Sequence, residues 1–68
     1  MKFTVNGKPR TLEGSPTIAD YLRHLGVSPL AVAVELDGAI VKRDQFEATP
    51  LHEGAKLEVV RMMGGGSI

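Results

Sequence analysis

One amphipathic segment stands between two hairpin-like blocks, and this order limits the fold more than any other feature. Apolar residues recur there at helical spacing, and they are Ile18, Ala19, Leu22 and Leu25. Gly26 follows where a left-handed residue commonly ends a helix. The pattern predicts a helix over residues 17–25, with Ser15 or Thr17 as its N-cap. A helix with one apolar stripe needs a sheet to cover that stripe.

Two dipeptides, Asn6-Gly7 and Asp37-Gly38, are typical of tight hairpin turns because both positions tolerate positive φ. The runs beside them predict strands near residues 2–6, 8–12, 30–36, 39–41 and 56–62. Pro9 cannot donate to a ladder, which places it on an open edge or at a strand start. Residues 30–36 are almost continuously apolar, and this content predicts a central strand. Residues 45–51 are expected to be irregular, with Phe46 and Leu51 as anchors.

These elements predict an α+β fold of the β-grasp, or ubiquitin-like, type. A mixed sheet of four to five strands would pack on the single helix, with the first and last strands parallel side by side. We expect one domain over residues 1–62 and a flexible tail over 63–68. With no Trp, one Tyr and two Phe among 68 residues, the core is expected to be aliphatic.

Composition excludes several classes of function. The chain has no cysteine, so thiolate metal sites, iron–sulfur clusters, thiol nucleophiles and persulfide carriers are excluded. Eight basic residues balance eight acidic ones without a basic stripe, which argues against a nucleic-acid partner. We expect no signal peptide, no membrane segment and a cytoplasmic protein. His24 and His52 stand alone in the sequence and make poor metal ligands. No catalytic constellation is present, so we expect no independent enzymatic activity.

The chain closes with Met62-Met63-Gly64-Gly65-Gly66-Ser67-Ile68. Such a glycine run is often a linker, because glycine is the most flexible residue. It can also serve as a narrow arm that carries a carboxylate into a partner's active site. Four or five extended residues reach about 15 Å.

The chain resembles the ThiS family of ubiquitin-like sulfur carriers. The resemblance rests on the early Asn6-Gly7 turn, on VAVELDGAIVKRDQF over 32–46, and on LHEGAKLEVV over 51–60 before the glycines. It implies a protein co-substrate with no bound cofactor. A ThiF-like adenylyltransferase would use ATP to activate the terminal glycine carboxylate. A cysteine desulfurase relay would then convert it to a thiocarboxylate, and thiazole synthase (ThiG) would take the sulfur.

Gly66 is the expected activated residue, with Gly64 and Gly65 as the rest of the arm. Ser67 and Ile68 depart from the family pattern, because they put another carboxylate at the terminus. We expect that they are trimmed or are a cloning remnant. Other readings stay open: a carrier for molybdopterin synthase, a carrier for tRNA thiolation, or a non-catalytic β-grasp interaction module.

The residues just before the glycines are candidates for partner binding, and they are Val60, Arg61, Met62 and Met63. Val60 and Met62 should share the face of Glu58, opposite to the core-facing Leu57 and Val59. Methionine suits a surface that meets more than one partner. Single exposed apolar residues are also common on ordinary surfaces.

Overall fold

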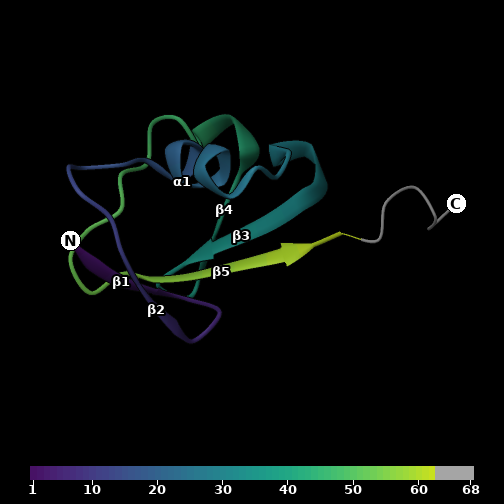
Figure 1. Ribbon diagram of the computed structural model, residues 1–68. Coiled ribbons are helices and arrows are strands. Elements are labelled where there is room, and N and C mark those ends of the chain that lie inside the picture. The colour runs from purple at the N-terminus through teal and green to yellow at the C-terminus, as the bar shows by residue number, and fades with distance from the viewer. Residues whose placement is uncertain (63–68) are drawn as a thin grey trace, which may run out of the picture.

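The computed structural model describes residues 1–62, and its core is a five-stranded mixed sheet that carries one α-helix (Figure 1). The strands lie in the order β2-β1-β5-β3-β4. The elements are β1 (Lys2–Val5), β2 (Lys8–Thr11), α1 (Ile18–Leu25), β3 (Val32–Leu36), β4 (Ala39–Val41) and β5 (Lys56–Arg61), with 3₁₀ helices η1 (Pro29–Ala31) and η2 (Arg43–Gln45). The predicted β-grasp architecture is confirmed.

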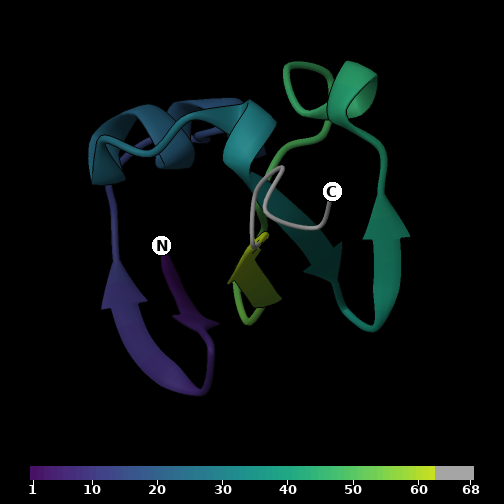
Figure 2. The ribbon, with the colours of Figure 1, turned by 90° about the vertical axis from the view of Figure 1, so that its right-hand side faces the viewer.

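The sheet curves around its helical side. Figure 2 shows α1 and the segment around η2 lying together over the concave face, while the two hairpins form the outer walls. Both predicted hairpin turns are present, since Asn6 and Asp37 have φ of 52° and 53°. Each is followed by a glycine that also has positive φ, as the tight turn requires.

The helix begins with a reciprocal cap at Thr17. Its hydroxyl accepts the Asp20 N–H at 3.1 Å, and the Asp20 carboxylate accepts the Thr17 N–H at 2.9 Å. Gly26 ends the helix with φ of 76°. The predicted stripe is wrong at one position, because Leu25 is 44% exposed and Tyr21 is buried instead. Leu25 is the last residue of α1, and the chain turns at Gly26, so Leu25 is only partly covered while Leu22 one turn earlier is buried.

The core is not purely aliphatic, which corrects the expectation from composition. All three aromatic residues are buried, and the rings of Phe3 and Tyr21 meet edge to face with centroids 5.4 Å apart. Phe46 and Leu51 are buried as predicted. The buried set is Phe3, Val5, Ile18, Ala19, Tyr21, Leu22, Val32, Val34, Phe46, Leu51, Ala55 and Leu57. Few aromatic residues therefore still supply much of the core, because each one buries a large area.

The strand of the segment 30–36 is interior, as predicted, because it lies between β5 and β4, and the middle strand of the sheet is β5. Strand β5 runs parallel to β1 and antiparallel to β3, which confirms the predicted pairing of the first and last strands. The segment 30–36 starts as η1 and becomes a strand only at Val32. β3 lies beside the edge strand β4, and its Ala33 and Glu35 are exposed. The apolar residues of this run therefore come from one buried face and from the exposed Ala33 on the other face.

The Asn6 side chain extends the parallel pairing of β1 and β5 beyond the end of β1. Its Oδ1 accepts the Val59 N–H at 2.9 Å, and its Nδ2 donates to the Val59 carbonyl at 3.1 Å. The backbone N–H of Asn6 donates to the Leu57 carbonyl at 2.8 Å. The side-chain amide of Asn6 therefore makes the two hydrogen bonds that one more residue of β1 would make, at the point where the backbone enters the turn.

We predict that Asn6→Asp lowers the free energy of unfolding by about 1 kcal/mol, because the carboxylate cannot donate to the Val59 carbonyl. Asp tolerates the same positive φ, so the substitution isolates the hydrogen bond. Urea unfolding measures the change. Part of the loss, relative to the unmodified chain, should be recovered when acid protonates the new carboxyl group. An unchanged stability at neutral pH would contradict the role of this contact.

Asp37 joins two turns at the end of the sheet where β5 begins. Its carboxylate accepts the Lys56 N–H at 2.9 Å and lies 2.7 Å from Nε2 of His52. The Lys56 N–H, and then His52, lower the pKa of Asp37. The Asp37 carboxylate, helped by the Glu53 carbonyl, raises the pKa of His52. The sequence indicated that His52 stands alone, but in the fold its ring contacts Asp37. The two residues are 15 positions apart in the chain, so the sequence did not show this contact.

The pair should stabilise the fold most between the ordinary pKa values of the two groups, 3.8 for Asp37 and 6.5 for His52. The contribution of Asp37 is lost as pH falls through its lowered pKa. That of His52 is lost as pH rises through its raised pKa. We predict that the stability difference between the unmodified chain and His52→Gln is largest in this window. Denaturation midpoints of the two proteins across pH measure this stability difference. A difference that does not change with pH would refute a stabilising role for the Asp37–His52 pair.

Candidate functional site

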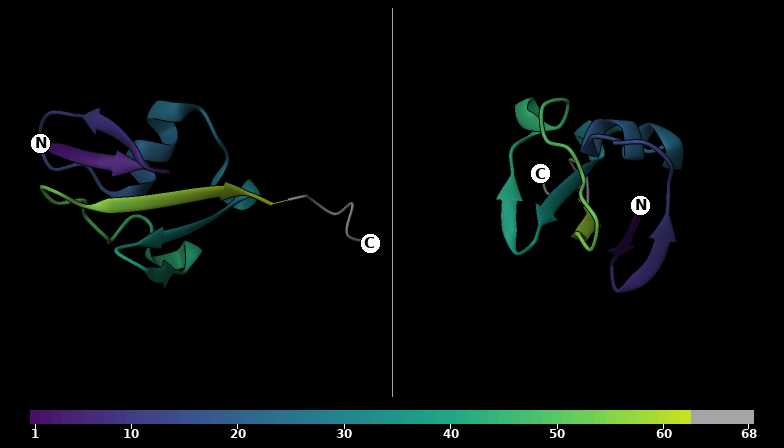
Figure 3. Two further views of the ribbon diagram at one scale, coloured as in Figure 1. Left: turned by 90° about the horizontal axis from the view of Figure 1, so that it is seen from below. Right: turned by 90° about the vertical axis from the view of Figure 1, so that its left-hand side faces the viewer.

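The candidate site is the end of β5, where the chain leaves the sheet toward the glycines. Figure 3 shows β5 running between β1 and β3 and pointing away from the N-terminus, and β3 accompanies it to Arg61. The strand is held to its last described residue, because the Met62 N–H donates to the Ala31 carbonyl at 2.8 Å. The sheet therefore fixes the direction in which the following residues depart. Met63, Gly64, Gly65, Gly66, Ser67 and Ile68 lie outside the described residues, and their predicted roles stay predictions.

The predicted partner-binding residues divide between two faces. Val60 is 58% exposed on the face turned away from α1, and continued alternation past Arg61 places Met62, which is 45% exposed, on the same face. Arg61 alternates with them and points to the helical side, like Leu57 and Val59. Val60 and Arg61 thus lie on opposite faces, as strand alternation in the sequence predicts, and their role in partner binding stays a prediction. Val60 and Met62 can act together, whereas Arg61 belongs to another surface.

The sheet face away from α1 carries further exposed apolar residues that the sequence did not mark. Ala33 pairs with Val60, and Ile40 of β4 is 78% exposed on the same face. Between them lie Glu35 and Glu58, which pair directly across β3 and β5. We call the exposed side chains of Ala33, Ile40, Val60 and Met62 the outer patch. Their proximity depends on strand register, which a single sequence does not specify.

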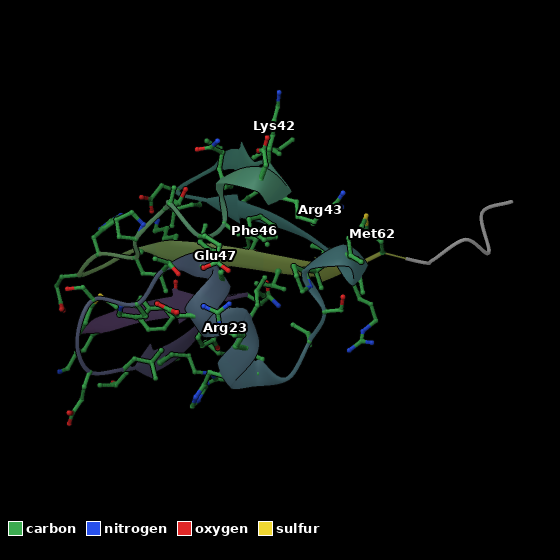
Figure 4. All side chains as sticks on the ribbon, turned by 90° about the horizontal axis from the view of Figure 1, so that it is seen from above. Arg23, Lys42, Arg43, Phe46, Glu47 and Met62 are labelled. Carbon is green, nitrogen blue, oxygen red and sulfur yellow. The ribbon has the colours of Figure 1, made fainter. Side chains whose placement is uncertain are left out.

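The helical side has a charged cluster of its own (Figure 4). Arg23 of α1 reaches Glu47 at 3.0 Å and Asp20 at 2.8 Å. Glu47, and then Asp20, raise the pKa of Arg23 above its ordinary value. This cluster ties the helix to the loop that carries the buried Phe46. Its charges are satisfied within the chain, so we assign it a structural role.

Over the part of the chain that the structure describes, no group of three or more His, Asp or Glu residues could hold a metal ion. Over the same residues, no helix is long and apolar enough to span a membrane. The pairing of Asp37 with His52 has only these two members and lies at the other end of β5. The chemistry expected of this chain thus centres on the segment that follows Met62.

Comparison with known proteins agrees with this geometry. The ThiS family model matches residues 3–66. The chain is 39% identical to the sulfur carrier protein ThiS of Thermus thermophilus, over 91% of this chain and 95% of that protein. It superposes on the crystal structure of the thiamine biosynthesis protein ThiS from Geobacter metallireducens with a TM-score of 0.83 and 40% identity. That match covers 97% of this chain and 100% of the other.

A longer protein is also similar. The thiazole synthase of Magnetococcus marinus is 41% identical over 97% of this chain, but the chain spans only 20% of that protein. The thiazole synthase of Paramagnetospirillum magneticum is 39% identical, and the chain spans 21% of it. The chain thus spans about a fifth of the length of these two relatives. Since the family model covers nearly the whole sequence, including the three glycines, the chain belongs to the ThiS family, as its sequence resemblance indicated.

Proposed function

We propose that this chain is a sulfur carrier of thiamine biosynthesis that acts as a protein co-substrate and not as an enzyme. The observation that carries the proposal is the match to the ThiS family through residue 66. It is supported by a strand that leads from the centre of the sheet directly toward Gly64, Gly65 and Gly66. The domain itself supplies no nucleophile or general base. Its part is to present a carboxyl group, and we expect it to do so in the cytoplasm.

The carboxylate needs activation because its negative charge makes it a poor electrophile. In the proposed scheme an oxygen of the Gly66 carboxylate attacks the α-phosphorus of ATP, and pyrophosphate leaves. A ThiF-like adenylyltransferase binds the ATP, so the carrier holds no cofactor. The terminal sulfur of a persulfide on a cysteine desulfurase relay then displaces AMP and forms an acyl persulfide. A thiol reductant cleaves its sulfur–sulfur bond, which leaves a thiocarboxylate on Gly66 and converts the thiol to a disulfide. Glycines suit this step, since side chains would widen an arm that must enter a buried site.

Thiazole synthase is the proposed acceptor of the sulfur. The two thiazole synthases above each contain a segment similar to this chain within one polypeptide. A covalent connection keeps two domains at a high effective concentration, which is useful when they work together. This observation favours the thiazole pathway over the molybdopterin or tRNA thiolation alternatives.

The central prediction is that a chain ending at Gly66 gains an adenylate and then a thiocarboxylate. The chain is incubated with a ThiF-like enzyme, ATP, a cysteine desulfurase with cysteine and a thiol reductant, and its intact mass is measured. An oxygen-to-sulfur exchange is the expected result. The matched control retains Ser67 and Ile68, and it should stay unmodified because Gly66 then has no free carboxylate. A chain ending at Gly66 that forms neither species would refute the carrier function.

The outer patch is predicted to dock the activating enzyme. We expect Val60→Lys and Met62→Lys each to raise the KM for the carrier about tenfold with little change in kcat, because exposed apolar anchors contribute binding energy. Thr11→Lys is the matched control, since Thr11 pairs with Lys2 on the same sheet face but lies in the edge strand β2. Urea unfolding checks that the variants remain folded. Equal effects of all three substitutions would argue against a local docking surface.

A further inference from the structure

A second surface lies on the helical side of the sheet, beside the end of β5. It is a groove that encloses about 310 Å³ between the last turn of α1 and strands β1, β2, β3 and β5. Its floor includes the buried Tyr21 and Val32, and the half-exposed Leu25 lies at its edge. The groove is open because α1 stops at Gly26 and β1 stops before the end of β5. We call it the basic groove.

Three cations line this groove, and they are Lys8, Arg10 and Arg61. Lys8 and Arg10 pair with the core-facing Val5 and Phe3, so their side chains lie on the helical side of the sheet. Arg61 joins them from β5. Within residues 1–62, no carboxylate lines the groove and none of these three cations forms an ion pair. Of the three cations, Arg10 donates from its guanidinium to the Pro9 carbonyl at 2.9 Å.

This arrangement differs from the other cationic cluster of the helical side. Arg23 is neutralised by Asp20 and Glu47, whereas the groove concentrates three of the chain's eight basic residues on a molecule with no net charge. The three positive charges repel one another, and a bound anion would offset this repulsion. The apolar floor beneath them favours a ligand that also has an apolar group. Small inorganic anions lack such a group.

We propose that the basic groove docks an acidic peptide segment of a partner protein. A leucine or phenylalanine side chain of the segment lies on the floor beside Leu25, and flanking carboxylates pair with Lys8, Arg10 and Arg61. The segment would then sit next to the strand that leads to Gly66, on the face opposite to the outer patch. The proposal extends the carrier role proposed above, although its test does not require carrier activity. A partner could thus hold the carrier from both sides of β5.

The test is a titration of the ¹⁵N-labelled full chain with an acetylated and amidated peptide, Glu-Glu-Leu-Phe-Glu-Glu, followed by NMR. We expect saturable shifts at Lys8, Arg10, Leu25 and Arg61, without shifts at Ile40 on the outer patch. Arg10→Glu and Arg61→Glu should each weaken binding about fivefold. Lys42→Glu is the matched charge reversal at an exposed residue away from the groove, and it should leave binding unchanged. Salt of about 1 M should weaken binding, since it screens charges beyond about 3 Å.

Four results would overturn the proposal. They are absence of saturable shifts, equal binding of the peptide with Gln in place of Glu, equal weakening by Lys42→Glu, and shifts confined to the outer patch. Two other occupants of the groove would also overturn it. If the chain's own tail filled the groove, Arg10→Glu would shift the signals of residues 63–68 in the free protein. If a second copy filled it, the groove signals would change on dilution. None of these results depends on whether Gly66 can be adenylated.

Discussion

The parallel pairing of β1 with β5 is the interaction on which the rest of the structure depends. It joins residues about fifty positions apart, with Thr4 beside Lys56 and Val5 beside Leu57. Only when β5 lies between β1 and β3 do the two hairpins become one sheet that can cover the single apolar stripe of α1. Such long-range pairing has a large loop-closure cost. The two hydrogen bonds from the Asn6 side chain to Val59 extend a short ladder and help to offset that cost.

The same pairing decides how the chain can work as a carrier. β5 pairs with β1 at Lys56 and Leu57 and with β3 from Leu57 to Arg61, and the Met62 N–H donates to the Ala31 carbonyl, so the sheet fixes the position of Met62. An edge strand would lack this support on one side. The residue that carries the proposed chemistry can therefore lie outside the fold while its point of departure is set by the fold.

Local signals predicted most of the fold, because they depend on a few neighbouring residues. The turns at Asn6-Gly7 and Asp37-Gly38, the cap at Thr17 and the end at Gly26 all follow from local backbone chemistry. The errors arose where tertiary context decides. Leu25 fits the helical stripe but lies at the edge of an open groove, and residues 30–36 are apolar enough for two buried faces although Ala33 and Glu35 face outward. The pairing of His52 with Asp37 joins two separate turns, so no local pattern indicates it.

The candidate site was predictable in its position but not in its shape. The glycines and the family resemblance locate it at the end of β5, and alternation correctly separates Val60 and Met62 from Val59. Arg61, the other described candidate of this segment, lies on the opposite face, since a strand presents successive residues to opposite faces. Because β5 lies in the middle of the sheet, the residues on its two faces have different neighbours. Val60 lies beside Ala33 on an apolar surface, whereas Arg61 lies with Lys8 and Arg10 in the basic groove. The proposed carrier therefore presents two chemically different surfaces at the end of β5, and different partners can bind different ones.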